Sequence, residues 1–229
     1  MDETWVQAYL SRIGAEPPAR PDDEALRDLH LRHLLAVPFE NLSIHLGEDI
    51  VLDDDALVAK IVDRRRGGFC FELNGAFGAL LSALGYDVTY LDARVFVDGD
   101  PSVPYGHLAL RVGPWLVDVG FGSHIHHPLR IDERGDQKDP AGVFRIAETP
   151  EGDLDVLRDG RPVYRLETRP RRLRDFVTGC WWHRTSPESH FTRVSGIRVR
   201  RPVRDGGSAS GATAAAPARR PGPCRGSAR

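Results

Sequence analysis

Apolar side chains recur at helical spacing through most of the first 85 residues. The spacing predicts four helices, over residues 4–13, 22–36, 53–65 and 71–84. Asp22 or Asp23 is expected to open the second helix and the run Asp53-Asp54-Asp55 the third, because an aspartate side chain accepts a hydrogen bond from first-turn amides. Gly85 ends the fourth helix. The first part of the chain is therefore predicted to be helical.

After Gly85 the pattern changes to short apolar runs separated by turn residues. We expect strands over residues 88–91, 94–97, 107–112, 115–119, 126–131, 143–148, 153–158 and 161–168, with a short helix near 171–182. The first two runs read as one strand with an interruption. Helices followed by a series of antiparallel strands indicate an α+β fold rather than alternating βα units.

One predicted hairpin brings a histidine and an aspartate together. If Gly113 and Pro114 form its loop, His107 and Asp118 project from the same face and lie diagonally opposite, within reach of a hydrogen bond. The other face then receives a continuous apolar set. A four-residue loop would keep this arrangement, whereas a three-residue loop would move Asp118 to the opposite face.

Cys70 follows a Gly-Gly turn and stands at the start of the fourth helix. Free amide N–H groups and the helix dipole stabilise a thiolate at that position. The alternative is a small buried hydrophobic residue. A thiolate nucleophile needs a base, and the base needs a group that orients it. Among the histidines, His107 alone has a carboxylate, that of Asp118, placed beside it by the local geometry of the hairpin. Cys70, His107 and Asp118 are thus predicted to perform acyl transfer or hydrolysis through a thioester.

The other histidines are weaker candidates. We expect His30 and His33 to be solvated on their helix. His124, His126 and His127 stand close together but lack a cysteine or carboxylate partner at ligand spacing, so we expect surface histidines and no metal. His183 and His190 could border a cleft.

Composition restricts the cellular compartment and the class of partner that we expect for this protein. The chain has 229 residues, 41% of them hydrophobic, and no apolar run near the roughly 20 residues of a membrane span. Three widely spaced cysteines and an acidic N-terminus without a secretory signal point to the cytoplasm. Residues 201–229 hold six arginines and one acid, which leaves the rest of the chain acidic and argues against nucleic acid as the main partner. Residues 205–229 contain no large apolar side chain, and the predicted disordered tail is 201–229.

Five motifs, in consistent order over residues 1–193, resemble the arylamine N-acetyltransferase family. They are VPFENL at 37–42, RGGFCFELN at 66–74, His107-Leu108, VDVGFG at 117–122 and TSPESHF at 185–191. The resemblance implies a cysteine-protease-like arrangement of three domains. We expect a helical domain at 1–85 with the cysteine, an antiparallel β-barrel at 86–170 with the histidine and aspartate, and the remnant of an α/β lid at 171–200.

The resemblance also implies a reaction. Cys70 would take an acetyl group from acetyl-CoA and pass it to an arylamine, arylhydroxylamine or arylhydrazine in a ping-pong scheme. The matching positions assign Phe39, Phe121 and Phe191 to the acceptor pocket, where ordinary core aromatics are the alternative. They place Gly106, Gly122 and Ser189 at the coenzyme.

Two further expectations concern the support of the site and the state of the protein. Glu40 and Arg66 match an ion pair that braces the loop leading into Cys70, called the cysteine loop below. A weak ion pair at the surface is the alternative. The protein is expected to be a monomer or weak homodimer that needs no metal, nucleic acid or membrane.

This chain departs from the family after Arg193, where the strands expected of the lid are missing. That departure puts coenzyme binding in question more than the triad. The alternatives are a macrolactam-forming amide synthase of the same family, a thiol protease or amidase, and a weakly catalytic remnant that binds ligands.

Overall fold

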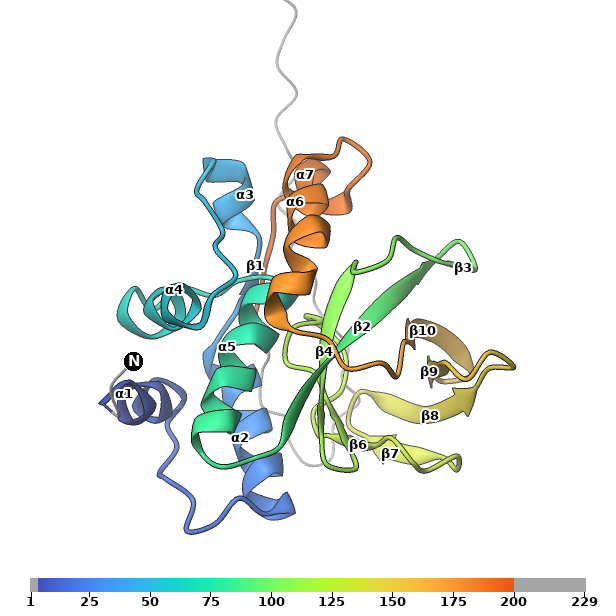
Figure 1. Cartoon of the computed structure of the whole chain (residues 1–229), viewed down its shortest axis with the longest axis horizontal. Coiled ribbons are helices and arrows are strands. Elements are labelled where there is room, and N and C mark those ends of the chain that lie inside the picture. Colours follow the sequence, from blue (N-terminus) through green and yellow to red (C-terminus); the bar gives the residue numbers. More distant parts are fainter. Residues whose placement is uncertain (1–3, 200–229) are drawn as a thin grey trace, which may run out of the picture.

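The computed structural model describes residues 4–199 and joins a group of helices to a curled antiparallel sheet (Figure 1). The helices before the sheet are α1 (Thr4–Ile13), α2 (Asp23–Ala36), α3 (Leu42–Leu46), α4 (Asp54–Val58), the π-helical turn η1 (Ala59–Asp63) and α5 (Cys70–Ala83). The 3₁₀ turn η2 (Leu173–Phe176), α6 (Val177–Thr185) and α7 (His190–Arg193) follow the sheet. The α+β class is confirmed.

The predicted helix starts agree with the structure. Asp22 caps α2 by accepting from the Ala25 amide at 3.0 Å, and Asp53 caps α4 by accepting from the Ala56 amide at 2.8 Å. The third helix does not run on as one α-helix, because it passes into the π-helical turn η1 after Val58. Cys70 is the first residue of α5, as predicted.

The main sheet runs in the order β6-β5-β4-β2-β10-β9-β8-β7, with β3 beside β2, and its strands curve into a nearly closed barrel (Figure 1). Its strands are β2 (Val88–Val97), β3 (Asp100–Pro101), β4 (His107–Val112), β5 (Trp115–Val117), β6 (Leu129–Arg130), β7 (Gln137–Asp139), β8 (Gly142–Glu148), β9 (Leu154–Arg158) and β10 (Arg161–Leu166). Two short strands outside it, β1 (Phe39–Glu40) and β11 (Ile197–Arg198), pair with each other.

β5 and β10 each end two residues earlier than expected, at Val117 and Leu166, and two other strand predictions were also wrong in extent. β2 is continuous, because the buried Asp92 in the expected gap accepts a hydrogen bond from the Tyr105 amide at 2.8 Å. The run 126–131 forms a strand at Leu129–Arg130 only, since the histidines before it bond to Asp139 through their backbone amides. The distribution of apolar residues along the sequence gave no indication of the contacts with Tyr105 and Asp139.

The predicted hairpin has the predicted register, with Val112 opposite Trp115 and Leu110 opposite Val117. Its two faces enter different cores. One face joins the core shared with the helices, through Leu108, Leu110, Val112, Val117 and Val119. Ala109 and Leu116 on the other face join the core inside the barrel. The hairpin therefore connects the two cores, and His107 and Asp118 stand on its barrel side.

The segment after the sheet returns to α5. Gly179 of α6 lies so close to the barrel that a Cβ there would be 1.9 Å from the Tyr105 carbonyl oxygen. α6 therefore packs directly on the backbone that leads into β4. The domain boundaries at residues 85 and 170 stay a prediction, and the tail predicted for 201–229 lies outside the described residues. Across residues 4–199, no helix has both the length and the apolarity to cross a membrane.

Candidate functional site

Cys70 lies at the meeting point of the helices and the barrel. It begins α5, is 2% exposed, and has no disulfide partner within residues 4–199. The amides of the first turn of an α-helix have no intrahelical acceptor, so the start of α5 presents positive potential to the sulfur. The preceding loop has the glycines it needs: a Cβ on Gly67 would lie 2.0 Å from the Pro38 carbonyl oxygen.

His107 and Asp118 form the expected hydrogen bond, with 2.8 Å between Nε2 and Oδ2. Both side chains are buried. Burial alone would lower the pKa of His107, but the charge and hydrogen bond of Asp118, with a further hydrogen bond from Cys70, raise it well above its ordinary value. Burial alone would likewise raise the pKa of Asp118, and His107 holds it well below its usual range. The pair therefore favours an imidazolium beside a carboxylate.

Asn74 connects this pair to the helix that carries Cys70. Its amide nitrogen donates to Asp118 Oδ1 at 2.9 Å and to the Leu108 carbonyl at 2.6 Å, and its oxygen accepts from the Val119 amide at 2.9 Å. Asn74 is fully buried and stands one turn after Cys70. The asparagine belongs to the motif that carried the resemblance, yet helical spacing alone did not single it out.

The aromatic residues assigned to the acceptor pocket divide into two groups around Cys70. The Phe39 and Phe191 rings contact each other at a tilt with centroids 6.1 Å apart, and Phe191 contacts Phe69, the residue before Cys70, at 5.7 Å. Phe121 packs edge-on against His107 at 5.2 Å. All three assigned residues are partly buried. Their assignment to an acceptor pocket stays a prediction.

The residues assigned to the coenzyme have partners within the protein. A Cβ on Gly106 would lie 2.8 Å from the Val103 carbonyl oxygen, and one on Gly122, whose φ is +86°, would lie 3.3 Å from Phe39. Ser189 is fully buried, and its hydroxyl accepts from the Phe191 amide at 3.2 Å. Packing alone therefore accounts for these residue types, and coenzyme binding by them stays a prediction.

His183 was offered only as a residue that could border a cleft, and the structure gives it a definite place. Its Nε2 lies 2.8 Å from the Gly106 carbonyl oxygen and its Nδ1 lies 3.2 Å from the Ser189 hydroxyl. Burial lowers the pKa of His183 to about 4, so the ring is neutral near pH 7 and bridges both groups. It thereby links α6 and α7 to the residue before His107.

Beneath the cysteine loop lies a cluster of charged side chains. Arg66 pairs with Glu40 at 2.9 Å, and the Glu40 side chain is only 3% exposed, so the alternative of a surface pair is wrong. Lys60 pairs with Glu72 at 2.5 Å in a second, more deeply buried contact. The sequence offered no signal for Lys60, because its partner is 12 positions away and on another helix.

Several histidines expected at the surface are buried. His30 and His33 of α2 are fully buried: His33 lies 3.0 Å from the Tyr9 hydroxyl, and its ring contacts Phe77 at a tilt with centroids 5.0 Å apart. His124 is 1% exposed and lies 3.2 Å from the Tyr164 hydroxyl. These solvated-histidine predictions were wrong because each ring finds an aromatic or polar partner from a distant segment. Residues 4–199 contain no group of three or more metal-ligand side chains.

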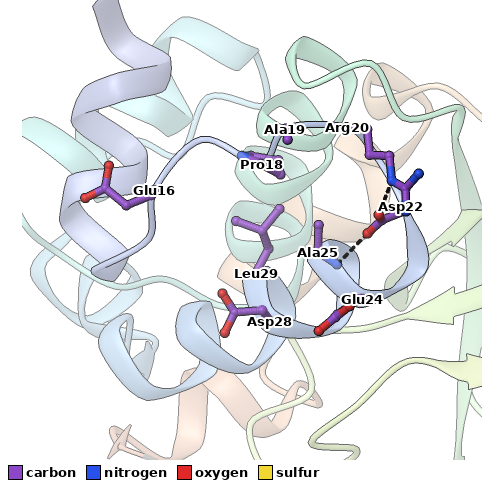
Figure 2. Close-up of a pocket in the computed structure, with 9 residues that line it drawn as sticks. All are labelled: Glu16, Pro18, Ala19, Arg20, Asp22, Glu24, Ala25, Asp28 and Leu29. Carbon is purple, nitrogen blue, oxygen red and sulfur yellow. Dashed lines mark hydrogen bonds and ion pairs between the residues drawn. The ribbon is translucent and has the colours of Figure 1, made fainter.

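Open hollows occur at two places, among others, on the surface of residues 4–199. One of about 360 Å³ lies over the α1–α2 loop and α2, lined by Arg20, Leu29 and the acidic groups Glu16, Asp22, Glu24 and Asp28, and contains none of the predicted site residues (Figure 2). The other, of about 560 Å³, lies over β2, β10 and the β9–β10 turn, and Phe121 is part of its wall. Because Phe121 also contacts His107, the second hollow adjoins the predicted triad.

Comparisons of the sequence with known proteins give one consistent family. A family model described as N-acetyltransferase matches residues 22–207, which extends the match past Arg193, where the resemblance was expected to stop. The chain is 37% identical to an arylamine N-acetyltransferase / N-hydroxyarylamine O-acetyltransferase of Salmonella typhimurium, over 82% of this chain and 70% of the relative. It is 38% identical to an arylamine N-acetyltransferase of Mycolicibacterium smegmatis, over 83% and 74%.

Solved structures give the same result. The arylamine N-acetyltransferase of Salmonella typhimurium superposes with a TM-score of 0.81 at 34% identity, covering 88% of this chain and 77% of that one. The Mycobacterium marinum arylamine N-acetyltransferase in complex with CoA gives a TM-score of 0.77 at 34% identity, covering 84% and 76%.

Proposed function

Because this chain belongs to the arylamine N-acetyltransferase family, we propose that it moves an acetyl group from acetyl-CoA to the nitrogen of an arylamine, arylhydroxylamine or arylhydrazine. The single observation that supports this most is the placement of Cys70 at the start of α5 against the His107–Asp118 pair. A buried sulfur beside an imidazolium is arranged to act as a thiolate nucleophile.

In the proposed first half-reaction, the Cys70 thiolate attacks the carbonyl carbon of the acetyl thioester. The bond from that carbon to the coenzyme sulfur breaks, and His107 gives its proton to the departing thiolate. Asp118 holds the ring through Nε2, which leaves the other ring nitrogen for the sulfur side. The enzyme then carries acetyl-Cys70 and a neutral His107.

In the second half-reaction, the acceptor nitrogen attacks the acetyl-Cys70 carbonyl. His107 takes a proton from that nitrogen, and the carbon–sulfur bond breaks to restore the thiolate–imidazolium pair. We propose that the acceptor ring lies among Phe39, Phe121 and Phe191, since their rings flank Cys70 and His107 on two sides. Aromatic side chains bind a flat aromatic ring through stacked and edge-on contacts.

Coenzyme A is proposed as the leaving group, in keeping with the CoA complex of the Mycobacterium marinum relative. Gly106, Gly122 and Ser189 are the candidate contacts. We further propose a cytoplasmic protein that works as a monomer or weak homodimer.

Intact mass spectrometry tests this function directly. The purified protein is mixed with acetyl-CoA, with Cys70→Ser as the control. We expect a gain of one acetyl group on the wild type alone, and its loss on adding an arylamine. If the folded wild type gains no mass, an acetyl ester of a nitrophenol, which needs no coenzyme site, is supplied instead. Acetylation by the ester alone would refute acetyl-CoA as donor, and no acetylation by either would refute Cys70 as the nucleophile.

A different acceptor class would be visible in the same experiment. An amide synthase would accept a long acyl thioester and close it onto its own amine, whereas an acetyltransferase would discharge acetyl-Cys70 to a free arylamine.

A further inference from the structure

Lys60 and Glu72 form a buried ion pair beneath the cysteine loop. Lys60 Nζ is 2.5 Å from Glu72 Oε1, and their side chains are 7% and 2% exposed. A buried ion pair stabilises a fold little when compared with apolar packing, since both charges lose their hydration. The pair therefore calls for an explanation other than stability.

Glu72 is held in place by the backbone that leads into Cys70. It is the third residue of α5, and its Oε2 accepts from the Phe69 amide at 3.2 Å, as the glutamate of a capping box does. A Cβ on Gly68 would lie 2.8 Å from the same oxygen, so Gly68 lets the loop pass directly over the carboxylate. Glu72 thus fixes the residues on the N-terminal side of the sulfur.

This cap creates an electrostatic conflict with the thiolate. Glu72 follows Cys70 by two positions in the same first turn, where little water screens one negative charge from the other. Burial also raises the pKa of Glu72, and Lys60 opposes that rise through its charge and hydrogen bond. An ammonium group 2.5 Å away makes the cap nearly neutral as seen from the sulfur.

The neighbouring basic side chains are paired with other acids, so Lys60 is the group that neutralises the Glu72 carboxylate. Its Nζ also donates to Ser43 Oγ at 2.8 Å, which fixes the ammonium between the two oxygens. Arg66 is paired with Glu40 and Glu48, and Arg184 with Asp49. Toward Cys70 itself, the barrel presents His107, which Asp118 holds, and α6 presents Cys180, while His183 of α6 packs against Phe71.

We propose that Lys60 is a positioning residue for Cys70: it neutralises the Glu72 carboxylate, so that the carboxylate can cap the cysteine loop without repelling the thiolate. This rests on the proposed function, in which Cys70 is the nucleophile. The π-helical turn η1 aims Lys60 at this point, and π-helical turns are frequent at functional sites.

The test measures the pH dependence of Cys70 alkylation by iodoacetamide between pH 4 and 9. Cys180→Ala and Cys224→Ala in every protein leave one thiol to follow. Four proteins are compared: this background, Lys60→Met, Glu72→Gln and the double variant. A glutamine at 72 is a matched control, since its amide oxygen can still accept from the Phe69 amide.

We expect Lys60→Met to raise the midpoint of alkylation by about one pH unit, because an uncompensated carboxylate is left in the same buried first turn as the sulfur. Glu72→Gln should lower the midpoint, since the ammonium is left unpaired. The double variant should return near the background value. If Lys60 and Glu72 had a purely structural role, both single variants would lose stability. Their alkylation midpoints would then not move in opposite directions.

The inference is overturned if folded Lys60→Met leaves the midpoint unchanged, or if both single variants move it in the same direction. Should Lys60→Met fail to fold, adding it to Glu72→Gln must still raise the midpoint. The proposed function fails separately, if the background protein alkylates with the midpoint near 8.5 of an ordinary thiol.

Discussion

Asn74 donates one hydrogen bond to Asp118 and accepts another from the amide of the next residue, and so ties the cysteine helix to the barrel at the predicted triad. Its side chain is fully buried, and all three of its hydrogen bonds cross from the helices to the barrel. These hydrogen bonds therefore help to fix Cys70 relative to His107, together with the apolar packing of α5 on the hairpin.

Replacing Asn74 by alanine should reduce both stability and activity. The change leaves Asp118 Oδ1 with one fewer donor and the buried Val119 amide without an acceptor, at a cost of about 2–4 kcal/mol for the two groups together. Urea unfolding at pH 7 measures the loss. Ser82→Ala, on an exposed part of the same helix, serves as control and should change stability by less than about 0.5 kcal/mol.

Gly120→Ala should impair catalysis through backbone displacement. A Cβ there would lie 2.8 Å from the Cys70 Cα and 2.6 Å from the Asn74 amide nitrogen, so the loop after Asp118 must move away from the helix. We expect at least a tenfold loss in kcat/KM, since a small misplacement of catalytic groups is costly. Gly196→Ala is the matched control, because a Cβ there meets no atom within 4 Å. Equal activities of the two variants would contradict the prediction.

The His107–Asp118 pair should impose a pH dependence on stability. The raised pKa of folded His107 keeps a proton bound where the unfolded chain has lost it, so stability should fall as pH rises above about 6.5. The slope should approach about 1.4 kcal/mol per pH unit, the value for one proton. The lowered pKa of Asp118 adds stability above its unfolded pKa, which is lost as pH falls.

This dependence is best measured in a Cys70→Ala background, because loss of a proton from the thiol on folding would offset its uptake by the imidazole. Urea midpoints at pH 6, 7.5 and 9 are compared with and without Asp118→Asn. The substitution should flatten the fall above pH 6.5. An identical slope in both proteins would mean that Asp118 does not hold the proton on His107.

Asp92→Asn should stabilise the protein at neutral pH. Burial raises the pKa of Asp92 to about 6, so the folded protein binds a proton between about pH 4 and 6 that the unfolded chain releases. Stability is therefore lost as pH rises through this window, and the loss persists above it. Asparagine keeps an oxygen for the Tyr105 amide and removes the charge. We expect a gain of about 1–2 kcal/mol at pH 7.5 that vanishes below pH 4.

The hairpin shows why part of the site could be predicted from the sequence. Side-chain alternation and a two-residue loop fix which residues share a face, so the meeting of His107 and Asp118 followed from local geometry. The start of α5 at Cys70 followed from spacing and from the glycines before it.

Other parts of the site depend on contacts that no local pattern encodes. Lys60, in a π-helical turn, meets Glu72 of another helix 12 positions away, and His183 reaches Gly106 across 77 positions. β1 and β11 have two residues each, too few to show a period, and they exist because their backbones pair with each other. The histidines misplaced at the surface share this cause, since their partners come from distant segments.

The span of the Asn74 contacts has a consequence for synthesis of the protein. These bonds reach 34 and 44 positions along the chain, so they cannot form until the β4–β5 hairpin has left the ribosome and docked on α5. Until then Cys70 has no imidazole beside it. The pairing of sulfur and imidazole that the proposed mechanism requires therefore forms only once the helices and the barrel have joined.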